Sequence, residues 1–144
     1  MGASGWRYVV SYDGEPSQAL AGLRERELAA GTFFWDSDYL GEAPTTIDAL
    51  DAIRDGDEYW EVGSHSILDM DRVVPFDDED HDGTVRELPP TDAEALFGTR
   101  TPSLEQFEAA EDNIPGIRSW SGQYQLLYDG ARPTQIVFWG FSGD

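Results

Sequence analysis

Cysteine is absent from this sequence of 144 residues, which excludes disulfide bonds, thiolate catalysis and cysteine-based zinc sites. A membrane span is excluded as well, because no stretch approaches the run of about 20 apolar residues that crosses a bilayer as a helix. The first thirty residues lack the basic start and apolar core of a secretory signal. We therefore expect a soluble cytoplasmic protein that makes no contact with membranes.

Lysine is absent too, and nine arginines face 29 acidic residues, giving a net charge of -20. Such a surface repels phosphate backbones, which argues against a nucleic acid partner. A charged partner is therefore expected to be a basic protein. Two explanations need no partner: codon usage in a genome rich in G and C, and adaptation to a salty cytoplasm.

Signatures of cofactor binding and catalysis are missing. The glycines have neither the dinucleotide-binding spacing nor the Walker spacing, so the sequence predicts no phosphate cradle and no cofactor. His65 and His81 are the only imidazoles, and no metal-ligand pattern surrounds either of them. With 29 acids in the chain, no pair stands out as an acid-base couple.

What the sequence does contain is enough apolar material for a core. Hydrophobic residues make up 40% of the chain and aromatic residues 12%, including five tryptophans. Burial of these side chains offsets the entropy lost on folding, and the length is typical of one domain. We expect residues 1–144 to form a single acidic domain.

Several segments have the alternation or composition of strands. Residues 6–12 alternate with a period of two, and residues 32–35 are a short apolar run that predicts a second strand. At least one strand is expected within residues 59–74. Residues 120–128 and 134–141 are rich in aromatic and β-branched residues and are joined by a short connection, which predicts a C-terminal β-hairpin.

Four segments have helix signals. Residues 16–30 follow Pro16 and precede Gly31, and Thr45 and Thr91 each start a capping pattern that leads to a glycine stop. Thr101 and Pro102 open a fourth helix. Together these elements predict an α+β fold, with a mostly antiparallel sheet and short helices packed on one of its faces. Residues 75–90 are expected to form an exposed loop without regular structure.

The most acidic part of that loop has half of a calcium-binding pattern. Asp78, Asp80 and Asp82 occupy positions one, three and five of such a loop, and Gly83 occupies position six. Position twelve, which should carry a bidentate glutamate, is Pro89. Together with Asp77, this loop is therefore interpreted either as a solvated segment or as a docking surface for a basic partner, with calcium as a weaker alternative.

Two aromatic regions complete the candidate binding residues. Trp60, Glu61 and His65 lie close in sequence, and an acid among aromatic side chains can have a raised pKa. Trp139 and Phe141, near the end of the chain, are the aromatic residues expected to be most exposed. Both sets are hypotheses, because most aromatic side chains in a domain of this size belong to the core.

Three functions remain open at this stage. The leading hypothesis is a cytoplasmic binding protein of the inhibitor or immunity type, which covers the basic active site of a nucleic-acid-targeting partner by charge and shape. The alternative is a small enzyme or ligand-binding domain with a pocket near Trp60, Glu61 and His65. A third reading is a salt-adapted or cation-responsive domain whose acidic loop becomes ordered on binding cations.

Overall fold

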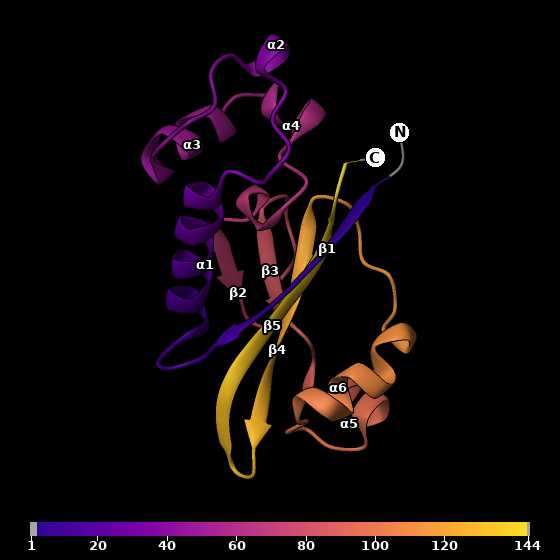
Figure 1. The fold of residues 1–144 in the computed structure, drawn as a ribbon. Helices are drawn as coiled ribbons and strands as arrows, with labels where there is room; N and C mark the ends of the chain where they lie inside the picture. Colours follow the sequence, from indigo (N-terminus) through magenta and orange to yellow (C-terminus); the bar gives the residue numbers. More distant parts are fainter. Residues whose placement is uncertain (1–2, 144) are drawn as a thin grey trace.

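A five-stranded sheet with the order β1-β5-β4-β3-β2 runs through the computed structural model, which describes residues 3–143 (Figure 1). The strands are β1 (Ser4–Ser11), β2 (Arg72–Val74), β3 (Thr84–Glu87), β4 (Ser121–Asp129) and β5 (Arg132–Ser142). The two long pairings, β1 with β5 and β4 with β5, are antiparallel. The short pairings of β3 with β2 and β4 are parallel, so the sheet is mixed while most of its residue pairs are antiparallel, as predicted.

Six helices and two 3-10 turns connect the strands. They are α1 (Pro16–Ala30), α2 (Ser37–Leu40), α3 (Ile47–Arg54), α4 (Tyr59–Val62), η1 (Ile67–Asp69), α5 (Pro90–Phe97), α6 (Leu104–Ala110) and η2 (Glu111–Asn113). The long helix begins at Pro16 and ends at Gly31, whose φ of 69° is the left-handed conformation that favours glycine. Side-chain caps from Thr46 and Ser103 start α3 and α6, and the α+β class and the C-terminal hairpin are confirmed.

Helices cover both faces of the sheet, whereas the sequence predicted one. Alternate residues of β5 point to opposite faces: Ile136 and Phe138 pack with Leu20 of α1, while Val137 packs with Phe107 of α6. The strand is buried on both sides because α1 covers one face and α6 the other. A strand that is apolar in consecutive positions is typical of this arrangement.

Two segments differ from the sequence prediction. Residues 32–35 form no strand: Phe33 and Trp35 pack against the cluster around Leu50 and Tyr59, and the backbone nitrogen of Phe34 donates to the Ser64 carbonyl. Residues 75–90 are not wholly irregular, because β3 lies between β2 and β4. The four residues of β3 are too few to show the alternation typical of a strand. They form one because β2 and β4 pair with them.

Residues 59–74 contain β2, which confirms the strand expected there, but they begin with α4 rather than with extended chain. The helices α2, α3 and α4 lie together beyond the end of the sheet where β2, β3 and β4 begin (Figure 1). They enclose a separate apolar cluster, whose buried members are Leu28, Leu50, Tyr59 and Leu68. Within residues 3–143, no helix is long and apolar enough to cross a membrane.

Candidate functional site

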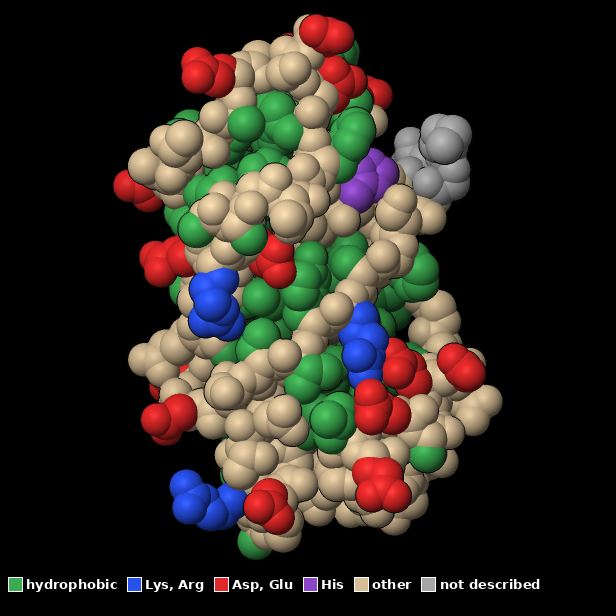
Figure 2. Space-filling model, viewed as in Figure 1, with side chains coloured by type: hydrophobic (Ala, Val, Ile, Leu, Met, Phe, Trp, Pro, Cys, Tyr) green, Lys and Arg blue, Asp and Glu red, His purple; other side chains and the backbone are tan. Residues whose placement is uncertain are grey.

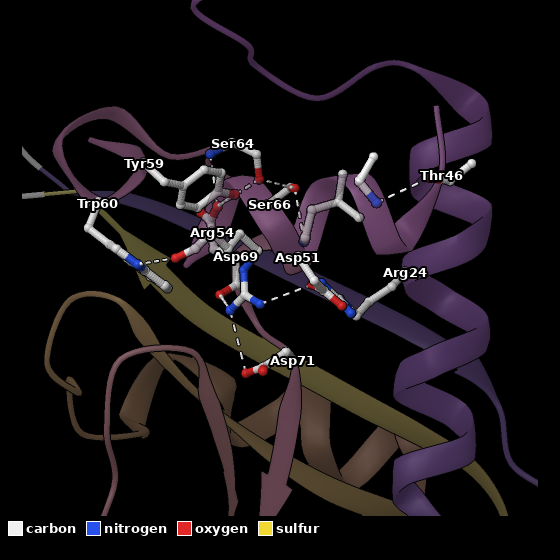
Figure 3. A network of polar contacts seen from close by, with 12 residues as sticks. Arg24, Thr46, Asp51, Arg54, Tyr59, Trp60, Ser64, Ser66, Asp69 and Asp71 are labelled. Atoms are coloured by element: carbon white, nitrogen blue, oxygen red, sulfur yellow. Dashed lines mark hydrogen bonds and ion pairs between the residues drawn. The ribbon is translucent and has the colours of Figure 1, made fainter. Parts of the chain in front are cut away.

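Asp69 is fully buried at the junction between the sheet and the helices α3 and α4 (Figure 3). Its carboxylate accepts hydrogen bonds from the Tyr59 hydroxyl, from the backbone nitrogen and hydroxyl of Ser64, both at 2.8 Å, and from the Ser142 hydroxyl at 2.5 Å. Four donors compensate the loss of hydration that burial of a carboxylate costs. The network therefore joins α4, the following turn and the end of β5.

The Tyr59 hydroxyl stays protonated within this network. Burial raises the pKa of the Tyr59 hydroxyl, and the adjacent carboxylate of Asp69 raises it further. Tyr59 therefore remains a proton donor throughout the physiological range. The indole nitrogen of Trp6 donates to the Ser142 hydroxyl at 3.0 Å, which extends the network to β1. Because Asp69 has no exposed surface, its role is to hold these segments together rather than to contact a ligand.

Arg54 forms the second half of the junction. Its guanidinium donates to the Asp69 carbonyl at 2.8 Å, pairs with Asp51 at 3.1 Å and Asp71 at 3.4 Å, and lies 5.3 Å from the ring centroid of Trp60 (Figure 3). Asp51 also pairs with Arg24 at 2.7 Å. Partial burial alone would raise the pKa of Asp51, but the hydrogen bonds and charges of the two arginines lower it.

The described ion pairs bring most of the arginines to acids of the same chain. Arg24 and Arg54 are 5% and 7% exposed and offer almost no positive charge to solvent. The other pairs join Arg7 to Glu108 and Glu111, Arg100 to Glu94, and Arg118 to Asp80 and Asp82. Five of the nine arginines therefore pair with acids of the same chain, whereas most of the 29 acids form no described ion pair.

We define residues 34–61 as the acidic end. They contain one arginine, the buried Arg54, and nine acids: Asp36, Asp38, Glu42, Asp48, Asp51, Asp55, Asp57, Glu58 and Glu61. Two large aromatic side chains are exposed here, Phe34 at 49% and Tyr39 at 50%. Figure 2 shows acidic side chains around this end of the molecule with hydrophobic side chains between them. Aromatic groups surrounded by like charges form a surface suited to a partner of opposite charge.

The predicted residues Trp60 and His65 share one aromatic cluster, which includes Trp60 and Phe34 of the acidic end. Trp60 packs edge to face against Trp120, with ring centroids 5.3 Å apart, and His65 lies 6.5 Å from Trp120 and 5.3 Å from Phe34. Glu61 is exposed on α4, and its side chain forms no hydrogen bond or ion pair with another described residue. The structure therefore joins Trp60 to His65 through Trp120 and leaves the Glu61 carboxylate in solvent.

Close packing in this cluster requires glycine at one position. A Cβ atom at Gly63 would lie 2.4 Å from the Trp120 ring, and the φ of Gly63 is 63°. His65 and Trp120 themselves have positive φ values of 53° and 66°, a conformation uncommon for residues with a side chain. The contacts around Trp120 hold the two strained residues in place.

The acidic loop between β2 and β3 pairs with an arginine from a distant part of the chain. Arg118, which precedes β4, pairs with Asp80 at 3.5 Å and Asp82 at 3.0 Å. Asp77 and Asp78 are exposed. Among the residues that the structure describes, no group of three histidine or acidic side chains is placed to hold a metal ion. A guanidinium thus bridges two carboxylates of the half-formed calcium pattern.

Trp139 and Phe141 lie on the α6 face, away from the other predicted residues. Both are half-buried rather than exposed, and they line a groove of about 330 Å³ between β1, β5 and the segment that follows α6. Arg7 and Glu111 form part of its wall. The indole nitrogen of Trp139 is buried and has no hydrogen-bond partner in the described part of the chain. The predicted residues thus occupy three separate places.

Sequence reasoning missed the Asp69 network and the role of Trp120. One signal was present: Asp69 stands between Leu68 and Met70 in an otherwise apolar run. An acid in such a position is commonly buried with hydrogen-bond donors around it. Its partners Tyr59, Ser64 and Ser142 have no comparable signal, since 73 positions separate Asp69 from Ser142.

Comparison with known proteins found no relative of this chain. No protein-family model, no curated protein and no solved structure matches it. Function is therefore inferred from the charge, exposed side chains and geometry of the chain itself.

Proposed function

We propose that this protein is an acidic binding module that docks onto a basic protein through its acidic end, residues 34–61. The observation that carries the proposal is the combination of nine acids, a single buried arginine and two half-exposed aromatic side chains within this segment. Aromatic side chains are enriched at the centre of protein interfaces, where they contribute much of the binding energy.

The acidic and the aromatic side chains contribute to different steps of binding. The acids attract a basic surface over a distance of about a Debye length, which raises the association rate. Phe34 and Tyr39 then contribute buried area and slow dissociation. The Asp69 network supports the surface by fixing α4 and the following turn to the sheet.

An inhibitor or immunity-type role in the cytoplasm is the specific form we favour. Enzymes and toxins that act on nucleic acids have basic active sites, because they bind phosphates. A surface with many carboxylates and few free cations competes for such a site. Inhibition by occlusion also requires no catalytic group on the acidic protein.

Binding assays with two charge-matched variants test this proposal. The first variant, D55N/D57N/E58Q, removes three exposed charges from the acidic end, and the control, D13N/D92N/D129N, removes three exposed charges elsewhere. The immobilised proteins are incubated at low salt with an extract of the organism that encodes the chain, and any basic protein retained is then purified and titrated. We expect the wild-type chain to bind the partner one to one, with an affinity that falls as salt is added. The first variant should weaken binding by at least tenfold and the control by less than threefold, because charges act within about 10 Å.

Equal effects of the two variants would contradict the assignment to the acidic end and leave only a general effect of net charge. Failure of the wild-type chain to retain any basic protein at low salt would contradict the proposed function itself. Measured inhibition of a purified nucleic-acid-cleaving partner would support the inhibitor role, whereas binding without inhibition would exclude it for that partner.

A further inference from the structure

Strand β1 is an edge strand, and its outer edge has no pairing partner in the described part of the chain. It pairs only with β5, through all eight residues from Ser4 to Ser11. It crosses in front of β5 in the view of Figure 1, and Figure 2 shows hydrophobic side chains at the surface on either side of this line. The opposite edge of the sheet, β2, is only three residues long.

The backbone groups on this free edge follow from the register. Tyr12 donates its backbone N–H to the Thr134 carbonyl, which makes this a hydrogen-bonded pair. Such pairs alternate along an antiparallel ladder, so the N–H and C=O groups of the intervening residues point outward. On β1 the outward residues are Gly5, Arg7, Val9 and Ser11.

Natural proteins usually protect such an edge. Lysine, proline, bulges and short length are the common devices, because an open ladder recruits any extended chain. β1 has none of these: the sequence Ser-Gly-Trp-Arg-Tyr-Val-Val-Ser contains a single charge, that of Arg7, and its pairing with β5 is uninterrupted. Arg7 is moreover engaged by Glu108 and Glu111.

The groove described above borders this edge. Cross-strand neighbours share a face of the sheet, so a strand added to β1 would place the side chain opposite Gly5 on the α6 face, beside Phe141 and Trp139. Gly5 has no side chain to occupy this space, and a Cβ atom there would be in contact with the Phe141 ring at 3.4 Å. Glu111 lines the groove and Glu108 lies beside Arg7.

We propose that β1 accepts an extended segment of a basic protein as a sixth strand, with alternate side chains of that segment entering the groove at Trp139 and Phe141. Charge selects the occupant: a second copy of this chain would bring -20 against -20, whereas a segment with arginines meets Glu108 and Glu111, two carboxylates that share the single positive charge of Arg7. The main-chain ladder supplies affinity, and the groove selects the side chains. The charge of the occupant rests on the function proposed above; the site itself is separate from the acidic end.

Synthetic peptides test this inference directly. The probe is an acetylated and amidated nine-residue peptide in which arginine and valine alternate, beginning and ending with arginine. When the peptide pairs antiparallel to β1 with its arginines on the α6 face, the N–H groups of those arginines face β1. One derivative carries N-methyl groups on three arginine residues, and a matched derivative carries them on three valine residues. A third peptide has glutamate in place of every arginine.

We expect methylation at the arginines to weaken binding by at least tenfold, because it removes the donors that face β1. Methylation at the valines, whose donors face solvent, should change affinity by less than threefold, and the glutamate peptide should not bind. Hydrogen exchange should slow by at least tenfold at the outward amides of Arg7 and Val9 when the arginine peptide is bound. The variant Val9→Pro, which removes one outward N–H, should lose affinity with an unchanged circular dichroism spectrum.

Equal affinities of the two methylated peptides, or unchanged exchange at Arg7 and Val9, would overturn the inference. Dimers of the chain that disappear in Val9→Pro would overturn the choice of a basic segment in favour of a second copy. A basic protein that binds while the β1 amides remain unprotected would overturn the edge site and leave the proposed function intact. If the arginine peptide binds β1 but the chain retains no basic protein, the edge site would be supported and the proposed function contradicted.

Discussion

The hydroxyl of Ser142 donates a 2.5 Å hydrogen bond to the carboxylate of Asp69, which joins the end of β5 to the 3-10 turn η1 across 73 positions of the sequence. The same carboxylate accepts from Tyr59 and Ser64. The buried carboxylate of Asp69 thereby links Tyr59 of the acidic end to the sheet. Substitution of Asp69 should therefore lower stability without changing the exposed charges, and substitution of exposed acids should do the opposite.

The first prediction concerns this buried carboxylate. Asp69→Ala should lower the free energy of unfolding by about 3 kcal/mol or more, because it leaves several buried donors without an acceptor. Asp38→Ala on the exposed surface of α2 is the control and should change stability by less than about 0.5 kcal/mol. Urea unfolding followed by tryptophan fluorescence measures both, and a loss below about 1 kcal/mol for Asp69→Ala would mean that water replaces the lost acceptor.

A second prediction separates a steric contact from backbone strain. Gly41 and Gly63 both combine a positive φ with an extended ψ, at 86° and −160° for Gly41 and at 63° and −173° for Gly63. A Cβ atom at Gly41 meets nothing within 4 Å, whereas one at Gly63 meets the Trp120 ring at 2.4 Å. Gly41→Ala should cost about 1–3 kcal/mol, because this backbone conformation is essentially restricted to glycine. Gly63→Ala should cost about 1–3 kcal/mol more, from the clash with the indole. Thermal or urea unfolding of the two variants gives the difference, and equal losses would show that the Trp120 ring moves away freely.

The pH dependence of stability should reveal the Arg24–Asp51–Arg54 cluster. Asp51 has a pKa below its ordinary value of 3.8, because the two arginines outweigh the effect of burial. A lowered pKa in the folded state gives stability that is complete above the unfolded value and declines as the pH falls below about 4 toward the folded value. Wild type should therefore be more stable than Asp51→Asn at pH 7, and the difference should shrink at pH 3. Urea unfolding at both pH values measures it; a difference that does not change with pH would contradict the assignment.

The acidic loop should not bind calcium specifically. Arg118 already pairs with Asp80 and Asp82, and position twelve of the pattern is Pro89, which has no carboxylate. Calorimetric titration with Ca²⁺ should therefore give no saturable heat below about 1 mM, in wild type or in Asp80→Ala, because the site lacks its bidentate ligand. A saturable heat in wild type that Asp80→Ala abolishes would restore the calcium hypothesis.

With a purified basic partner, the exposed aromatic side chains should govern dissociation. Phe34→Ala and Tyr39→Ala should each raise the dissociation rate by about tenfold with little change in the association rate, since truncation of an interface anchor acts mainly on dissociation. Phe76→Ala removes an aromatic side chain of similar exposure, 42%, outside the acidic end. Surface plasmon resonance measures all three variants, and an effect of Phe76→Ala equal to that of Phe34→Ala would place the interface elsewhere.

Local signals in the sequence were sufficient for the elements that carry them. Pro16 and Gly31 mark the ends of α1, and the aromatic and β-branched residues of 120–141 predicted the hairpin, because these preferences act within a few residues. The short strand β3 has no such signal. Its hydrogen bonds go to β2 and β4, so only the assembled sheet distinguishes it from loop.

The candidate site depended even more on distant contacts. Arg118 lies 36 positions after Asp82, and no local pattern pairs this arginine with the acidic loop rather than with any other acid. Trp60 and His65 are neighbours in sequence, but Trp120, the residue that joins them in space, is distant from both along the chain. Net charge, in contrast, is a property of composition, and the acidity was therefore evident from the start.

The edge-to-face pair of Trp60 and Trp120 has an optical consequence. Trp60 and Trp120 have ring centroids 5.3 Å apart and planes at 85°. At this separation the electronic transitions of two indoles couple, so we expect a paired positive and negative band in the circular dichroism spectrum. Trp60 belongs to α4, whereas Trp120 immediately precedes β4. Loss of this signal would therefore report separation of the helices from the sheet, even while the hairpin remains folded. The protein thus contains an intrinsic chromophore pair that follows the assembly of its acidic end in real time.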